Sequence, residues 1–158
     1  MTTREHILSR ALRARKNTGS RGAVVPCDRH RALVVDDEQS IVMIFQHQIE
    51  QELPDLHVDS ASNGLAAVEA FSKGHHGILV MDLSMPIMDG RQAFEEIARM
   101  CEARGWEMPS VIFCTGFAPR DFLEKVVQGH PERQLLLKPV GGDAVVKAIE
   151  QRLPHRLS

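Results

Sequence analysis

The stretch LVMDLSMPIMDG at residues 79–90 decides the fold, because a short apolar run ends abruptly at Asp82 and a turn follows. A continuous apolar run bounded by turn residues predicts a strand buried on both faces, as in a parallel sheet covered by helices. Three other fragments have the same form: LVVDDE at 33–38, IFCTG at 112–116 and LLLKP at 135–139. The pattern therefore predicts an α/β fold with polar residues at the carboxyl ends of four strands.

The polar residues at these strand ends are the candidate functional residues: Asp36, Asp37, Asp82, Thr115 and Lys138. In an open parallel sheet the carboxyl ends of the strands form the ligand crevice, so these side chains are expected to converge. Three carboxylates close together repel one another and favour a bound cation. Mg²⁺ suits such oxygen ligands and is usually held by one or two carboxylates together with a phosphate. The residues thus predict a magnesium site that meets a phosphoryl group.

Five units of a strand followed by a helix account for residues 31–153. The expected strands are 31–36, 57–61, 77–82, 110–114 and 133–137, and the expected helices are about 39–53, 64–73, 90–103, 119–128 and 142–153. The first helix is supported by Ile41, Phe45 and Ile49, which recur at helical spacing. Right-handed crossovers between parallel strands would place helices on both faces of the sheet.

These motifs resemble the receiver domain of two-component response regulators, of the single-domain kind that resembles chemotaxis regulators. The resemblance implies a flavodoxin-like (βα)5 fold, a doubly wound sheet of five parallel strands in the order 2-1-3-4-5. It implies that Asp82 accepts a phosphoryl group from a sensor histidine kinase or a histidine phosphotransfer protein. Such a domain is a signalling module and not an enzyme, beyond self-catalysed phosphoryl transfer and autodephosphorylation.

The resemblance also assigns roles to the other site residues. Asp36, Asp37 and Asp82 would bind Mg²⁺ with the backbone carbonyl of Ser84. The phosphoryl oxygens would be contacted by Thr115 and Lys138. The Lys138–Pro139 bond is expected to be cis, as is common in receivers of this kind. Output would pass to a protein target through the face formed by the fourth helix, fifth strand and fifth helix.

One position departs from the usual pattern of these receivers. Many carry an aromatic residue three positions before the lysine, where this chain has Leu135 and no tyrosine anywhere. We therefore expect Thr115 to act on the loop 116–119, with Phe117 or Phe122 moving with it. The bistable element would be the fourth loop and helix.

Two other functions compete with the phosphorylation switch. A metal-dependent phosphatase could use Asp82 as its nucleophile, but phosphatases of the haloacid-dehalogenase type place a second aspartate two residues later, where this chain has Ser84. A docking module without phosphorylation, a pseudo-receiver, is the other alternative. The presence of competent residues at all five strand-end positions argues against it.

The charges divide the chain into a basic extension at 1–30 and a receiver domain at 31–158. Residues 1–31 carry a net charge of +6 and the remaining 127 residues −8. The segment 3–16 could form a basic amphipathic helix, followed by a linker at 17–29 that contains Gly19, Ser20, Gly22 and Pro26. No helix-turn-helix fits there, so sequence-specific DNA binding is not expected.

The remaining sequence features favour a cytoplasmic protein, and they favour ordinary structural roles for the cysteines and for His75 and His76. No apolar run is long enough to span a bilayer, and the N-terminus lacks the apolar segment of a signal peptide. The three cysteines are too widely spaced to indicate a disulfide framework or a CxxC metal site. His75 and His76 are expected to be a solvated loop pair.

Overall fold

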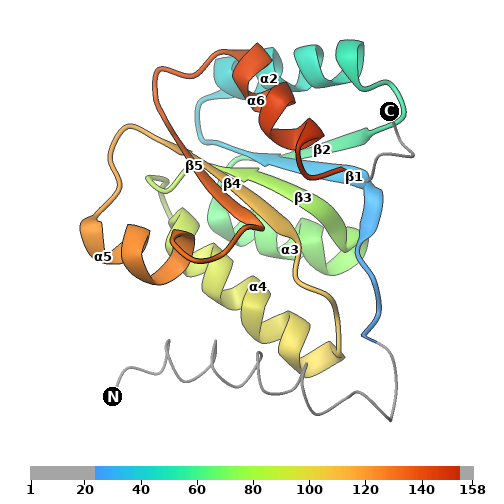
Figure 1. Ribbon diagram of the computed structural model, residues 1–158, viewed down its shortest axis with the longest axis vertical. Coiled ribbons are helices and arrows are strands. Elements are labelled where there is room, and N and C mark those ends of the chain that lie inside the picture. The colour runs from blue at the N-terminus through green and yellow to red at the C-terminus, as the bar shows by residue number, and fades with distance from the viewer. Residues whose placement is uncertain (1–23, 154–158) are drawn as a thin grey trace.

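The computed structural model describes residues 24–153. Their centre is a parallel five-stranded sheet in the order β2-β1-β3-β4-β5 (Figure 1). The strands are β1 (Asp28–Val35), β2 (His57–Ala61), β3 (His76–Met81), β4 (Ser110–Thr115) and β5 (Arg133–Leu137). The predicted fold class and strand order are confirmed.

Helices cover both faces of this sheet (Figure 1). The helices α2 (Gln39–Glu52) and α6 (Gly142–Glu150) pack on one face. On the other face lie α3 (Gly64–Gly74), α4 (Gly90–Arg104) and α5 (Arg120–Phe122). All residues of β3 and β4 are buried, because both faces of these central strands are covered. This explains why the strands appear in the sequence as continuous apolar runs.

The first strand begins three residues earlier than expected, at Asp28, and the chain before it also contributes to the structure. Val25 pairs with Trp106: its N–H donates to the Gly105 carbonyl at 2.9 Å, and its carbonyl accepts from Glu107 N–H at 2.8 Å. The Asp28 N–H donates to the carbonyl of His75. The sequence here has only the short apolar run 23–25, which ends at Pro26 and is too short to indicate a strand.

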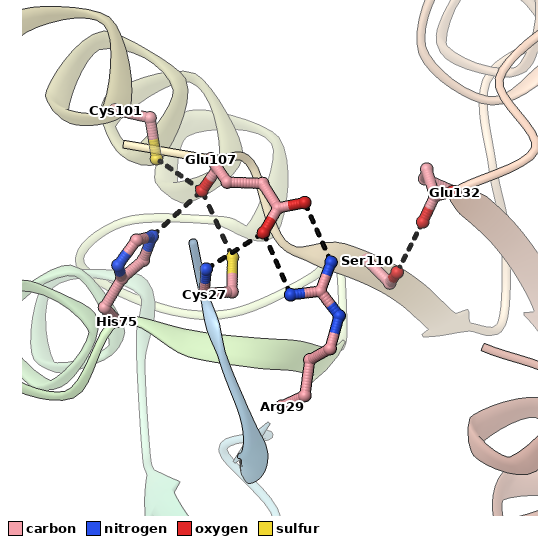
Figure 2. Close-up of polar contacts among 7 residues, drawn as sticks. All are labelled: Cys27, Arg29, His75, Cys101, Glu107, Ser110 and Glu132. Atoms are coloured by element: carbon pink, nitrogen blue, oxygen red, sulfur yellow. Dashed lines mark hydrogen bonds and ion pairs between the residues drawn. The ribbon is translucent and has the colours of Figure 1, made fainter. Parts of the chain in front are cut away.

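A polar cluster around Glu107 fixes this N-terminal segment at the start of β1 (Figure 2). The Glu107 carboxylate accepts from the Cys27 N–H at 2.9 Å and from both terminal nitrogens of Arg29, at 3.1 and 2.8 Å. The backbone carbonyl of Glu107 accepts from the Cys27 thiol, from the Cys101 thiol and from Nε2 of His75. Glu107 therefore joins β1, the end of α3 and the end of α4.

The fourth helix differs from expectation in its winding. After the short α5, residues Leu123–Val127 form a π-helix, η1, and Gln128 N–H donates to the Leu123 carbonyl at 2.8 Å. The Val126 carbonyl accepts from the Arg133 guanidinium at 2.9 Å. Phe122 and Val126 are buried, so the apolar spacing is the same as in an α-helix and could not reveal the wider turn.

The prediction of a solvated pair at His75 and His76 was wrong. His76 begins β3 and is fully buried, with Nε2 at 2.7 Å from Oδ2 of Asp59. Arg31 donates to the same carboxylate oxygen at 2.6 Å. The ring of His75 stacks on that of Trp106, with their centroids 4.1 Å apart. Each partner lies on another strand or loop, which explains why local sequence did not identify it.

The buried His76 gives a prediction for stability against pH. Burial lowers the pKa of His76 below its ordinary value of 6.5, although the hydrogen bond with Asp59 acts in the opposite direction. The unfolded chain therefore binds a proton that the folded chain does not. We expect the free energy of unfolding to fall as the pH drops below about 6.5, by at most about 1.4 kcal/mol per pH unit from this group.

Urea unfolding of the wild type and His76→Gln, from about pH 7 to about pH 5, measures this contribution. The variant should show the weaker pH dependence, and equal dependence in both proteins would contradict the prediction. Asp59 contributes to the free energy of unfolding in a separate, more acidic pH range. Burial opposes its charge, but the hydrogen bonds from His76 and Arg31 outweigh burial and lower the pKa of Asp59 to about 2. Its contribution is lost only as the pH falls from about 4 towards 2.

One expectation concerns residues outside the described range. The basic amphipathic helix at 3–16, with the rest of the extension up to residue 23, lies there. Among the helices of residues 24–153, none combines the length and the apolar character needed to cross a membrane.

Candidate functional site

Three carboxylates meet at the carboxyl edge of the sheet. Asp36 and Asp37 directly follow β1, and Asp82 directly follows β3, the neighbour of β1. One carboxylate oxygen from each residue lies within 4.8 Å of the other two. Asp36 and Asp82 are buried and Asp37 is exposed. The convergence predicted from the strand ends is therefore present in the structure.

Lys138 follows the edge strand β5, and its ammonium reaches this acidic group. Its Nζ donates to Oδ2 of Asp36 at 2.9 Å and to Oδ2 of Asp82 at 3.2 Å. The Lys138–Pro139 peptide bond is cis, which confirms the expectation. Burial opposes the charge of Lys138, but the hydrogen bond to Asp36 and the charge of Asp82 outweigh it and raise the pKa. The lysine is thus a cation in contact with two of the three carboxylates.

Thr115 is the last residue of β4, the strand between β3 and β5, and its side chain is buried. Its hydroxyl donates to the backbone carbonyl of Phe117 at 3.2 Å. The Phe117 side chain itself is 75% exposed. Thr115 therefore lies at the same edge of the sheet as the carboxylates, with its hydroxyl bonded to the loop that follows β4.

Backbone N–H groups hold two of the carboxylates in position. The Ser84 N–H donates to Oδ1 of Asp82 at 3.2 Å, and the Glu38 N–H donates to Oδ1 of Asp36 at 2.9 Å. In both residues the other oxygen, Oδ2, contacts Lys138. The two buried carboxylates therefore have a defined orientation set by the chain immediately after each strand.

The donor set fits Mg²⁺. Asp36, Asp37 and Asp82 supply three negative charges on oxygen ligands, and Lys138 neutralises only one of them. Mg²⁺ is a hard cation that prefers carboxylate, carbonyl and water oxygens, and it retains several water molecules. The exposed Asp37 leaves one side of the group open to solvent.

Sequence reasoning missed the support of the loop between β3 and α4. Gly90 N–H donates to the Leu83 carbonyl at 2.9 Å, and Gly64 N–H donates to the Met88 carbonyl at 2.9 Å. Gly64 follows Asn63, whose side chain caps α3 by accepting from Ala66 N–H, but an Asn-Gly pair in the sequence does not identify a distant partner.

Comparisons with known proteins agree with this geometry. Residues 32–150 match the family model described as the response regulator receiver domain. The chemotaxis protein CheY of Bacillus subtilis (strain 168) is 29% identical over 125 residues, which cover 78% of this chain and 98% of the relative. The transcriptional regulatory protein PdtaR of Mycobacterium tuberculosis (strain H37Rv) is 29% identical over 128 residues, covering 81% of this chain and 57% of the relative.

Solved structures show the same fold. The signal receiver domain of a putative Luxo repressor protein from Vibrio parahaemolyticus superposes with a TM-score of 0.67 at 21% identity, covering 82% of this chain and 93% of that one. A chemotaxis protein CheY4 structure from Vibrio cholerae gives a TM-score of 0.65 at 20% identity, over 80% and 100% of the two chains.

Proposed function

The chain belongs to the response regulator receiver domain family, and we propose that it is a phosphorylation switch in which Asp82 accepts the phosphoryl group. The observation that carries this proposal is the position of Lys138, whose Nζ contacts both Asp36 and Asp82 beside the exposed Asp37. The arrangement offers a nucleophilic carboxylate, a fixed cation and a group of oxygen ligands within one small volume.

The proposed reaction is transfer from a phosphohistidine to an aspartate. A carboxylate oxygen of Asp82 attacks phosphorus as the bond from phosphorus to the histidine nitrogen breaks, and the released imidazole takes a proton from solvent. Phosphoryl transfer depends mainly on positioning and on neutralising charge. The Lys138 ammonium would neutralise charge during the transfer. It can contact the carboxylate oxygen before the reaction and a phosphoryl oxygen after it.

Mg²⁺ completes the proposed site. Asp36, Asp37, Asp82 and the backbone carbonyl of Ser84 would hold the ion. When bound, it would supply positive charge to the phosphoryl oxygens and reduce the repulsion between an incoming phosphoryl group and the carboxylates.

Thr115 would report the phosphorylated state. Its hydroxyl donates to the Phe117 carbonyl, so transfer of this hydrogen bond to a phosphoryl oxygen would release the loop after β4. That loop leads into α5 and then η1, and η1 packs beside the edge strand β5. We propose that the downstream target binds the face formed by α5 with η1, β5 and α6.

The proposed partners are a sensor histidine kinase or a histidine phosphotransfer protein as donor and a protein target for output. Receiver domains are signalling modules. We propose no reaction for this chain beyond its own phosphorylation and autodephosphorylation. A cytoplasmic location belongs to the same proposal.

The test is binding of beryllofluoride, a mimic of the aspartyl phosphate, followed by backbone NMR shifts. Wild-type protein should bind it saturably and only with Mg²⁺, with shifts that extend from Asp82 to η1 and β5. Asp82→Asn should show none of these shifts. Absence of binding by the wild type would instead favour the docking module without phosphorylation. Shifts confined to the strand ends would contradict the proposed output face.

The loop after β4 also gives a prediction for the lifetime of the phosphorylated state. The bulky Phe117 lies two residues beyond Thr115, where its side chain can restrict the approach of an attacking water molecule. We expect Phe117→Ala to shorten the lifetime severalfold and Phe117→Leu to change it less. Decay of protein labelled with ³²P from phosphoramidate measures it, and an unchanged lifetime in Phe117→Ala would remove this role.

A further inference from the structure

The loop that follows Asp82 is closed on itself by one glycine. Gly90 N–H donates to the Leu83 carbonyl at 2.9 Å, which joins the two ends of the loop. A Cβ atom at Gly90 would lie 2.1 Å from the Asp82 carbonyl oxygen, so the backbone at Gly90 is in direct contact with the backbone at Asp82. Ser84, the proposed carbonyl ligand, lies inside this closed segment.

The middle of the loop has an unfavourable backbone conformation. Met88 N–H donates to the Pro86 carbonyl at 2.7 Å, which makes a γ-turn centred on Ile87 with φ of 71°. A γ-turn with positive φ is rare, and a β-branched residue tolerates it poorly. The Ile87 side chain is 77% exposed, so its own packing does little to hold the turn. Something outside the loop must therefore support this conformation.

Gly64 supplies a backbone hydrogen bond to this loop from outside it, in addition to the packing of Met85 and Met88 against the core. It is the first residue of α3, and its N–H donates to the Met88 carbonyl at 2.9 Å. A Cβ atom at Gly64 would lie 2.3 Å from that oxygen and 2.9 Å from the Met88 carbonyl carbon. These are backbone atoms, which cannot move aside as the end of a side chain can. Only glycine permits this approach without displacing Met88.

We propose that Gly64 is a positioning residue for the Mg²⁺ site, acting through Met88 and the closed loop on Ser84 and Asp82. The inference rests on the proposed function, because it concerns the same ion. Displacement of Met88 must be absorbed within the loop, since Gly90 fixes both loop ends beside Asp82. Gly64 touches no proposed ligand and acts from the start of a different helix.

Gly74, at the other end of α3, is the matched control. It is buried like Gly64, and an added Cβ would lie 2.5 Å from the ring of His76, away from the strand ends that carry the carboxylates. Both Gly64→Ala and Gly74→Ala introduce the same methyl group into the same helix, and both are expected to lose stability. Only the first should affect the ion.

The experiment is Mg²⁺ titration of the wild type, Gly64→Ala and Gly74→Ala, each checked for folding and followed by NMR shifts of Asp82 and its neighbours. Gly64→Ala should raise the Mg²⁺ dissociation constant about tenfold or more, the range found when outer-shell support of a metal site is removed. Gly74→Ala should stay within about twofold of the wild type. Equal affinities in all three proteins would overturn the inference while leaving the proposed function intact. No Mg²⁺ binding by the wild type would overturn both.

A measurement on wild-type protein keeps the inference testable if Gly64→Ala does not fold. Coupling between two sites is reciprocal. If the hydrogen bond from Gly64 to Met88 strengthens Mg²⁺ binding by a given factor, bound Mg²⁺ must stabilise that hydrogen bond by the same factor. Exchange of the Gly64 amide hydrogen should slow severalfold on addition of Mg²⁺, and that of the His76 amide, beyond the other end of α3, should not. Unchanged exchange at Gly64 with saturating Mg²⁺ would overturn the inference.

Discussion

Lys138→Met is expected to lower the rate of phosphorylation of Asp82 by about 100-fold or more while tightening Mg²⁺ binding. The first effect follows because a fixed cation aimed at developing charge typically contributes a factor of this size. The second follows because the Lys138 ammonium occupies oxygens of Asp36 and Asp82 that the ion would use. Without the Lys138 ammonium the three carboxylates repel one another more strongly, and a bound cation is favoured more.

Opposite signs for the two effects separate this prediction from general damage to the fold, which would weaken both. The measurements are phosphorylation by phosphoramidate, a small donor that needs no docking surface, and Mg²⁺ titration of the same samples. Lys147→Met, at an exposed position on α6, is the control and should change neither quantity by more than about twofold. Weaker Mg²⁺ binding in Lys138→Met would refute the proposed competition between ammonium and ion.

The acidic site could be predicted from sequence because its positions follow from topology. Each of its members directly follows a strand or ends one, and parallel strands bring their carboxyl ends to the same edge. Asp82 and Lys138 could therefore be placed together without knowledge of any side-chain contact. The cis bond before Pro139 came from the family resemblance, since the residues alone favour trans.

Contacts between irregular segments could not be predicted in the same way. The bond between Gly64 and Met88 joins a helix start to a loop, and no periodicity relates the two. The buried pair of His76 and Asp59 joins β3 to β2 across the intervening β1, so it depends on the register of three strands, which a single polar residue does not encode. The π-helical turn at 123–127 preserves the apolar spacing of an α-helix, so it also leaves no trace in the pattern.

The N-terminal segment was missed for a related reason. The prediction relied on apolar runs, and residues 24–30 contain none long enough to indicate a strand. Their place in the structure comes instead from polar contacts with a residue about eighty positions away, Glu107. The role of Glu107 in stability is therefore open to a direct test.

Glu107→Ala is expected to lower the free energy of unfolding by about 2 kcal/mol. The substitution leaves the buried Cys27 N–H without its acceptor, and an unsatisfied buried donor costs about 1–3 kcal/mol. It also removes the paired hydrogen bonds to Arg29, which contribute less because both side chains are about one third exposed. The backbone carbonyl that binds Cys101 and His75 remains.

Two further variants test whether the loss of stability in Glu107→Ala comes from the lost acceptor or from the lost charge. Glu107→Gln keeps an oxygen acceptor for Cys27 N–H and loses the charge, so it should cost less than Glu107→Ala. Glu124→Ala removes a carboxylate from an ion pair with Arg120 in which both side chains are exposed, and it should change stability by less than about 0.5 kcal/mol. Urea unfolding of the four proteins measures these differences. If Glu107→Ala were no more destabilising than Glu124→Ala, the polar cluster would not anchor the N-terminal segment, and backbone contacts such as the pairing of Val25 with Trp106 and the bond from Asp28 to His75 would hold it instead.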